Sequence, residues 1–184
     1  MTLKLVVILS LFAGRVSAQA ATAPLEPRSK GSPTAPVTVY EMSDFQCPYC
    51  RRFAHETFPA LERSYITPGK VRWVFINFPL TDIHPHASAA AQLALCAARQ
   101  KSFWRMHDLL FQYQEMWAPL QEAGPFFLSL ADSAGLSKPA MLACLEAPET
   151  LKAVQADAEG ASRSGANGRS GTFRTSLGRK AVAR

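Results

Sequence analysis

The sequence is poor in the residues that build metal clusters. It holds 4 cysteines and 4 histidines in 184 residues, and Cys47 and Cys50 are the one pair of cysteines that lies close along the chain. A zinc site usually takes a second such pair or two further ligands. Zinc remains an alternative with His55 as a third ligand, but no fourth is evident. We expect neither a metal nor a cofactor.

Acidic residues are missing from the last stretch of the chain. Residues 165–184 contain no Asp or Glu, whereas basic residues gather towards this end: Arg163, Arg169, Arg174, Arg179, Lys180 and Arg184. The formal net charge of +6 is therefore a property of the tail and not of a basic surface across the whole chain. We expect no nucleic-acid partner for the body of the protein.

Long apolar runs are also missing, apart from one at the N-terminus. Residues 5–13 (LVVILSLFA) follow the basic Lys4 and precede small residues, a pattern that indicates a signal peptide. We expect residues 1–18 to be removed, leaving a periplasmic or secreted chain without a membrane span. An uncleaved anchor or a buried helix is the alternative. Residues 19–35, rich in Ala, Pro and Ser, are predicted to be a flexible linker.

The central part combines strand and helix patterns. Residues 37–43 and 71–78 are rich in β-branched and aromatic residues, which predicts two strands with a helix from Pro48 between them. Pro59 is expected to kink that helix. Further helices are predicted at residues 86–98, 102–112, 125–134, 138–146 and 151–163. This order of elements predicts a parallel strand pair with a helical insertion.

The stretch DFQCPYCRRF is suited to redox chemistry. It puts the Cys47 sulfur at a helix N-terminus, where unpaired N–H groups and the helix dipole favour the thiolate. In such motifs the thiol pKa falls from about 8.5 to between about 3.5 and about 7.5. Cys50 lies one turn further and can resolve a mixed disulfide, while Pro48 and Tyr49 tune the pair. A structural bridge, which would add little stability across so small a loop, is the alternative.

The other two cysteines lie in apolar helical sequence. Cys96 stands in LALCAA and Cys144 in MLACLE. In an oxidising compartment we expect them to pair and to staple two helices of the insertion. Two buried free thiols are the alternative.

Several segments together resemble one family. GSPTAPVTVYEMSDFQCPYCRRF resembles the start of the DsbA-like thiol:disulfide oxidoreductases, and NFPLTDIHPHASAAAQLALCA, KSFWRMHDLLF and GLSKPAMLACLE resemble later parts of them. The resemblance implies an α/β fold of the thioredoxin type, in a domain of residues 36–168 with a helical insertion at about residues 84–164. It also implies an exported enzyme that exchanges disulfides with unfolded or reduced protein substrates and is reoxidised by an unidentified redox partner.

The resemblance also implies roles for single residues. Cys47 matches the nucleophile and Cys50 the resolving cysteine, while Cys96 and Cys144 match positions that form a second disulfide in some members. Glu41 matches an acidic residue under the active site that can handle protons; taken alone, it would be an ordinary strand surface residue. Three histidines of the resembling segments are interpreted as structural: His84, His86 and His107.

The resemblance ends near Gly168. The family has a Thr-Pro or Val-Pro pair that opens a third strand beside the cysteines, with the proline cis, but the last proline here is Pro148. Two further strands and a closing helix also have no counterpart, so residues 169–184 are predicted to be a basic, disordered tail. We attribute this to a shifted reading frame or a truncated gene; a true variant with a short tail is the alternative.

The expected loss of these strands has two consequences. The first strand would expose an unpaired edge, which predicts marginal stability, aggregation or a partner that completes the sheet. The chain would also lack the proline loop that receives substrate in the family. The alternative to an enzyme is therefore a non-catalytic remnant or binding module of the same fold.

Overall fold

The computed structural model describes residues 23–166 and 172–177. The predicted signal peptide lies outside the described residues. The first elements in chain order are η1 (Glu26–Arg28), β1 (Ser29–Lys30), β2 (Val37–Ser43), α1 (Pro48–Arg52), η2 (Phe53–Thr57), α2 (Phe58–Leu61), η3 (Glu62–Ile66) and β3 (Val71–Asn77). The later ones are α3 (Ala87–Arg99), α4 (Phe103–Gln112), α5 (Gln114–Trp117), α6 (Gly124–Ser133), α7 (Lys138–Glu146), α8 (Pro148–Arg163) and β4 (Thr172–Leu177).

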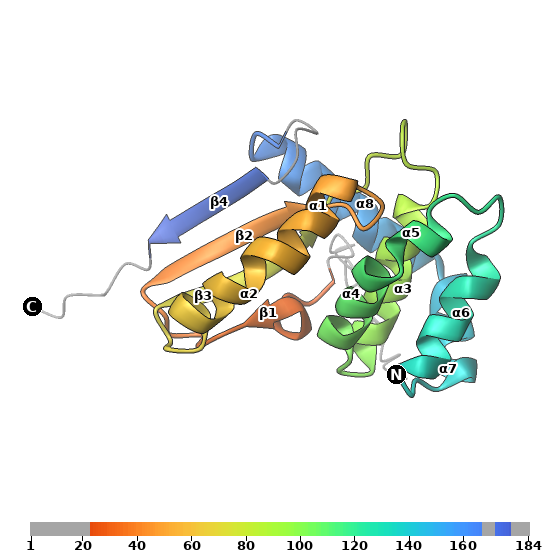
Figure 1. Ribbon diagram of the computed structural model, residues 1–184, viewed down its shortest axis with the longest axis horizontal. Coiled ribbons are helices and arrows are strands. Elements are labelled where there is room, and N and C mark those ends of the chain that lie inside the picture. The colour runs from red at the N-terminus through yellow and green to blue at the C-terminus, as the bar shows by residue number, and fades with distance from the viewer. Residues whose placement is uncertain (1–22, 167–171, 178–184) are drawn as a thin grey trace, which may run out of the picture.

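A four-stranded sheet in the order β1-β3-β2-β4 carries the active-site region (Figure 1). The two central strands β2 and β3 are parallel, in a register that runs from Val37 beside Val71 to Ser43 beside Asn77. Parallel neighbours need a crossover, here the helical run from α1 to η3. The predicted parallel pair with a helix between its strands is confirmed.

The prediction that no strand follows the helical insertion is wrong. Residues Thr172–Leu177 form β4, which pairs antiparallel with β2 from Met42 beside Thr172 to Val37 beside Leu177. The edge of β2 that was expected to be open is therefore covered, and the reason given for marginal stability is removed. Glycine, serine and arginine suggested a loop, but an unpaired neighbouring strand can draw a weak strand former into a sheet.

The prediction of a flexible linker at residues 19–35 is wrong for the part that is described. Here η1 leads into β1, which pairs antiparallel with β3, Ser29 beside Val74. The Arg28 side chain is fully buried and is ion-paired with Asp157 of α8. Asp157 also accepts a hydrogen bond of 2.8 Å from Asn77 Nδ2. A buried guanidinium needs such a partner, so this segment is held to the fold by charge as well as by strand pairing.

The helical insertion packs beside the sheet, with α3 at its centre (Figure 1). Alanines on α3 let α4, α6, α7 and α8 come close to it. Cys96 of α3 and Cys144 of α7 form a disulfide, with an S–S distance of 2.04 Å and a Cα–Cα distance of 5.7 Å. The buried Trp117 donates a hydrogen bond of 2.8 Å from its indole nitrogen to the Leu110 carbonyl. None of the helices described is long and apolar enough to cross a membrane.

The crossover from α1 to η3 is an irregular helix. Two segments, Phe53–Thr57 and Glu62–Ile66, have π-helical hydrogen bonding, and between them Phe58–Leu61 is α-helical. Pro59 stands in the first turn of this short α-helical segment. Proline lacks an N–H donor and cannot make the usual helical hydrogen bond to a carbonyl of the preceding turn. The wide π turn before Pro59 accommodates this missing hydrogen bond.

Candidate active site

Cys47 lies where the loop after β2 enters α1. It is the N-cap residue, with extended backbone angles of φ −73° and ψ 122°, and Pro48 follows in the first turn. Its N–H donates to the Asp44 carbonyl at 3.2 Å, and its own carbonyl accepts from the Arg51 N–H at 3.1 Å. Cys47 and Cys50 are 6% and 5% exposed, and both are free thiols in this structure. The helix start thus aims its free N–H groups at the first sulfur.

The pKa values of the two thiols are shifted in opposite directions. The side-chain hydrogen bond from Cys50 is the largest cause that lowers the pKa of Cys47 from 9.0 to about 6. The N–H groups of Cys50 and Tyr49 add to this effect, while burial and the Asp44 charge oppose it. The same bond and burial raise the pKa of Cys50. At neutral pH the reduced pair therefore carries its negative charge on Cys47.

A buried carboxylate, Asp44, fixes the loop in front of the cysteines. It is 3% exposed and accepts three hydrogen bonds: from the Gln46 N–H at 2.7 Å, the Leu80 N–H at 2.8 Å and His84 Nδ1 at 2.8 Å. These bonds tie the loop after β2 to the loop after β3. Asp44 was not among the residues expected from the sequence, although an Asp directly after a strand and before a helix is a signal for a loop that bonds its own backbone.

Two glutamines complete the support of the loop. Gln46 accepts from the His86 N–H at 2.7 Å and donates to the Ala118 carbonyl at 3.2 Å. Gln114 is buried and donates to the carbonyls of Phe45 at 2.6 Å and Cys47 at 3.1 Å. The helical insertion therefore positions the active-site loop directly, because Gln114 reaches the loop backbone and Gln46 of the loop reaches the backbone of the insertion.

Glu41 is buried and does not lie on a strand surface. It is 2% exposed, and the Trp73 indole N–H donates to its Oε2 at 2.8 Å. Burial raises the pKa of Glu41, against weaker lowering effects of His107, Trp73 and the Ser43 side chain. The Ser43 side chain also hydrogen-bonds Cys50. Ser43 therefore lies between the carboxyl of Glu41 and the thiol of Cys50.

The three histidines interpreted as structural take different places. His84 donates to Asp44, as described above, and His86 Nε2 donates to the Leu120 carbonyl at 2.7 Å. His107 is buried, and its Nδ1 donates to Asp108 Oδ1 at 2.8 Å. The first two hold loops, whereas His107 lies close enough to the buried Glu41 to lower its pKa.

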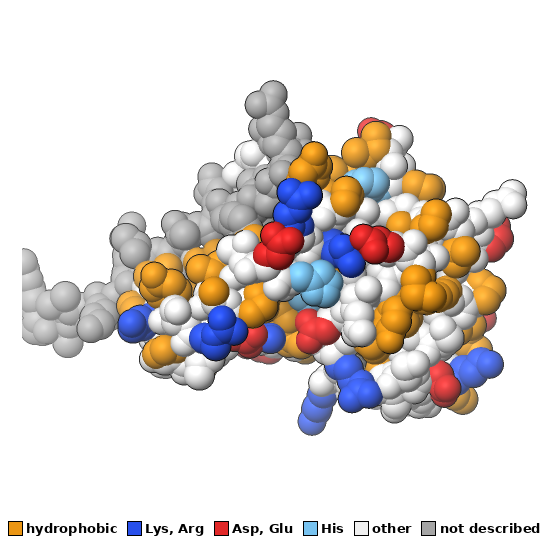
Figure 2. All heavy atoms as spheres, viewed as in Figure 1, with side chains coloured by type: hydrophobic (Ala, Val, Ile, Leu, Met, Phe, Trp, Pro, Cys, Tyr) orange, Lys and Arg blue, Asp and Glu red, His pale blue; other side chains and the backbone are white. Residues whose placement is uncertain are grey.

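The face beside α1 is open to solvent. Tyr49 is 59% exposed, and Arg52 lies over its ring at 5.7 Å from the centroid. A groove of about 580 Å³ runs from Pro48 along this face. Its lining is polar and charged: Arg51, Arg52, His55, Glu56, Gln112 and Glu115. Figure 2 shows acidic, basic and histidine side chains together over α1, α2 and α4. Pro48 and Tyr49, the two residues between the cysteines, thus form the outer surface of the pair.

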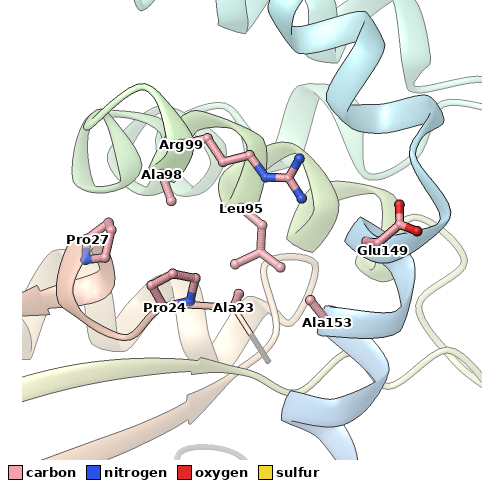
Figure 3. Close-up of a pocket in the computed structure, with 8 residues that line it drawn as sticks. All are labelled: Ala23, Pro24, Pro27, Leu95, Ala98, Arg99, Glu149 and Ala153. Carbon is pink, nitrogen blue, oxygen red and sulfur yellow. The ribbon is translucent and has the colours of Figure 1, made fainter. Parts of the chain in front are cut away.

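A separate cavity of about 200 Å³ contains none of the cysteines. It lies between the N-terminal segment, α3 and α8 (Figure 3). Its lining is mostly apolar, with one charged residue of each sign: Ala23, Pro24, Pro27, Leu95, Ala98, Arg99, Glu149 and Ala153. Within residues 23–166, no group of three or more His, Cys, Asp or Glu side chains could hold a metal ion.

Comparison with known proteins assigns the chain to a family. A family model described as Thioredoxin matches residues 25–169. The chain therefore belongs to the thioredoxin family, and the match ends where the resemblance read from the sequence ends.

Curated relatives match part of the chain. It is 41% identical over 88 residues to a probable disulfide bond formation protein D of Bacillus anthracis, covering 48% of this chain and 41% of the relative. It is 44% identical over 90 residues to the Na(+)/H(+) antiporter NhaA 3 of Salinispora tropica, covering 49% of this chain and 13% of the relative. The chain spans less than half the length of these relatives.

Solved structures share the fold more completely. The crystal structure of α-DsbA1 of Wolbachia pipientis matches with a TM-score of 0.73 at 22% identity, covering 82% of this chain and 74% of the other. The thioredoxin-like fold with a helical insertion is confirmed, and so is the resemblance to the DsbA-like proteins.

Proposed function

We propose that this chain is an exported thiol:disulfide oxidoreductase that exchanges disulfides with protein thiols through Cys47 and Cys50. One observation carries the proposal: the buried pair at the start of α1, in which the pKa of Cys47 is lowered to about 6 while that of Cys50 is raised. A stabilised thiolate is a good leaving group, so the disulfide of such a pair is a strong oxidant. Probable disulfide bond formation protein D, the Bacillus anthracis relative, supports this class of activity.

The exchange starts from the oxidised pair. A substrate thiolate attacks Cys47 Sγ; the bond between Cys47 and Cys50 breaks, and Cys50 Sγ leaves with the electron pair and takes up a proton. A second substrate thiolate then attacks the substrate sulfur of the mixed disulfide. Cys47 leaves as the stable thiolate, the substrate is oxidised by two electrons, and the enzyme is reduced. A separate redox partner must remove these two electrons.

The Glu41 carboxyl is assigned to proton transfer at Cys50. Its raised pKa keeps a proton on this carboxyl at a higher pH than usual. The buried Ser43 side chain lies between the two groups. A negative charge on the buried Cys50 sulfur would cost free energy unless it is neutralised by a proton or hydrogen-bonded. A nearby proton donor such as Glu41 lowers this cost.

Oxidation of a peptide with two cysteines tests the proposal. Residues 19–184 would be oxidised and mixed with the reduced peptide, with Cys47→Ser as the control. We expect rapid oxidation by the wild-type chain and none by the variant. Equal, slow rates for both folded proteins would overturn the enzyme assignment.

A binding module of the same fold is the second candidate. The sequence observation in its favour is that no proline follows Pro148, so the strand β4 has no proline to open it. A module of this kind would bind the reduced peptide without oxidising it. Two measurements separate the candidates. Oxidation of the reduced peptide reports the enzyme, and binding of a peptide in which both cysteines are replaced by serine reports the binding module. Binding without oxidation would favour the module.

Export is part of the proposal. It is supported by the apolar run at residues 5–13 and by the disulfide between Cys96 and Cys144, a bond that persists in oxidising compartments. Mass spectrometry of the chain expressed with its own N-terminus tests it: a product that begins near residue 19, outside the cytoplasm, is expected. A full-length cytoplasmic product would contradict it.

A further inference from the structure

The buried His107 on α4 takes no part in the exchange described above, yet it lies beside the carboxyl that is assigned to proton transfer. His107 is 2% exposed. Its ring packs edge-on against Phe75, with 5.3 Å between centroids, and Phe75 is the register partner of Glu41 across β2 and β3. The charge of His107 acts on the Glu41 carboxyl.

His107 also reaches the surface. Its Nδ1 donates to Asp108 Oδ1 at 2.8 Å, and the Asp108 side chain is 69% exposed. Both residues line a groove of about 520 Å³ between α4 and the helical run from η2 to η3. A buried titratable group is thus one hydrogen bond away from a carboxylate in solvent.

At the inner end, the chain of polar groups continues to the cysteines. The Ser43 side chain hydrogen-bonds both Glu41 and Cys50. Ser43 is 3% exposed, so water has little access to this part. The polar groups therefore form an inner set, Cys50, Ser43 and Glu41, and an outer pair, His107 and Asp108, and the charge of His107 acts on the inner set at Glu41.

We propose that His107 is the proton-transfer residue that connects Glu41 with solvent at Asp108. This rests on the proposed function and adds to it the route by which the proton enters and leaves. Imidazole groups exchange protons near neutral pH, which suits them to such a role.

When the bridge opens, Cys50 Sγ leaves with the electron pair and takes one proton from Glu41 through the hydroxyl of Ser43. Glu41 regains a proton from His107, and His107 takes one from water at Asp108. Reoxidation of the pair reverses each transfer, and one proton returns to solvent.

Other groups near this route are engaged elsewhere, lie on the opposite wall of the groove or are not ionisable. Lys30 lines the same groove, but its Nζ binds Glu62 at 2.7 Å and lies 4.7 Å from the centroid of the Trp104 ring. His55 lies exposed on the opposite wall. On the Glu41 side, β3 contributes the uncharged Trp73. The remaining neighbours of the His107 ring are aromatic: Phe45, Phe58, Phe103, Trp104 and Phe111.

Proton uptake during a single turnover tests the proposal. The oxidised protein would be opened by a reduced peptide in weak buffer, with a pH indicator for uptake and the peptide disulfide for exchange. The variants are His107→Gln and Asp108→Asn, with His55→Gln as the matched control. We expect uptake to be slowed by up to about 100-fold in His107→Gln, to be slowed less in Asp108→Asn, and to be unchanged in the control.

Two results would overturn the proposal. One is uptake in folded His107→Gln that keeps pace with wild type from about pH 5 to about pH 8. The other is Asp108→Asn that behaves as the control does. Asp108 is exposed, so its variant stays informative if His107→Gln does not fold.

A second measurement does not depend on activity. The carboxyl of Glu41 can be titrated by ¹³C NMR in the reduced protein, with Glu41→Gln to assign its signal. Because the charge of His107 lowers the pKa of Glu41, His107→Gln should raise it, and an unchanged midpoint would speak against the contact. If wild type fails to oxidise peptide while this shift is seen, the proposed function fails but the contact stands.

Discussion

Replacing Cys50 would test why Cys47 is acidic. The side-chain hydrogen bond from Cys50 is the largest cause of the low pKa of Cys47, which is about 6 against an ordinary value of 9.0. Cys50→Ala removes the donor, whereas Cys50→Ser keeps an O–H donor at the same position. We expect the pKa of Cys47 to rise towards 9.0 in Cys50→Ala and to stay low in Cys50→Ser.

The size of the effect follows from the two pKa values. At pH 7 a thiol with a pKa of about 6 is about 90% thiolate, and one with a pKa of about 9 is about 1% thiolate. Alkylation of Cys47 by iodoacetamide at pH 7 should therefore slow in Cys50→Ala by up to roughly 90-fold, since the thiolate is the reacting form. The N–H groups of the helix start remain in both variants and limit the change.

The same shift makes the stability of the reduced protein depend on pH. The pKa of Cys47 is lower in the folded chain than in the unfolded chain, so its contribution is complete above about pH 9 and is lost as the pH falls through about 6. At pH 7 it amounts to about 1.4 kcal/mol. The oxidised protein has no thiol to titrate and should lack this dependence.

Ultraviolet absorbance of the thiolate, followed against pH, measures the midpoint in each variant. Urea unfolding of the reduced and oxidised proteins at several pH values measures the linked stability. A low midpoint in Cys50→Ala, equal to that of wild type, would refute the assignment to the hydrogen bond and leave the helix start as the cause.

Three further changes have defined outcomes. Cys96→Ala with Cys144→Ala opens a bridge across 48 residues, and chain entropy predicts a loss of about 4 kcal/mol in the free energy of unfolding, measured with urea. Arg28→Met leaves the Asp157 carboxylate without its buried cation, and the same measurement should show a loss of about 3 to about 5 kcal/mol. Asp44→Asn removes a charge that raises the pKa of Cys47, so thiolate titration should give a lower midpoint.

Each of these has a control. Reducing the wild-type bridge between Cys96 and Cys144 should lower the free energy of unfolding as much as the double alanine substitution does. A much smaller loss on reduction would mean that the variant loses packing as well as the bridge. Adding Asp157→Leu to Arg28→Met removes both charges and should recover stability, which a loss of packing alone would not. His84→Gln keeps the Asp44 charge, and a midpoint that falls as far as in Asp44→Asn would contradict the electrostatic account.

Most of the redox pair could be predicted from local sequence. A strand, two cysteines around Pro48 and a helical pattern are consecutive in the chain, and a helix N-terminus acts on the residue that caps it. The resolving role proposed for Cys50 was predicted from the same spacing. The helices of the insertion could likewise be predicted from their periodicity, because their apolar faces lie within single segments.

The surroundings of the pair could not be predicted in this way. Asp44 meets His84 and Leu80, and Gln114 meets the Cys47 carbonyl, across distances in sequence that no local pattern encodes. His107 was interpreted as structural because a lone histidine on a helix has no partner until the sheet is folded against it. Its position beside Glu41 exists only in the tertiary structure.

By itself the sequence determined the place of the cysteine pair at a helix start, the parallel strands and the helical insertion, since each depends on residues close along the chain. Only the tertiary structure decided that residues 172–177 pair with β2, that Arg28 holds the N-terminal segment against α8, and that Glu41 is buried. Strand pairing and the burial of charge depend on which partners the rest of the fold supplies, and those partners lie far away in the sequence.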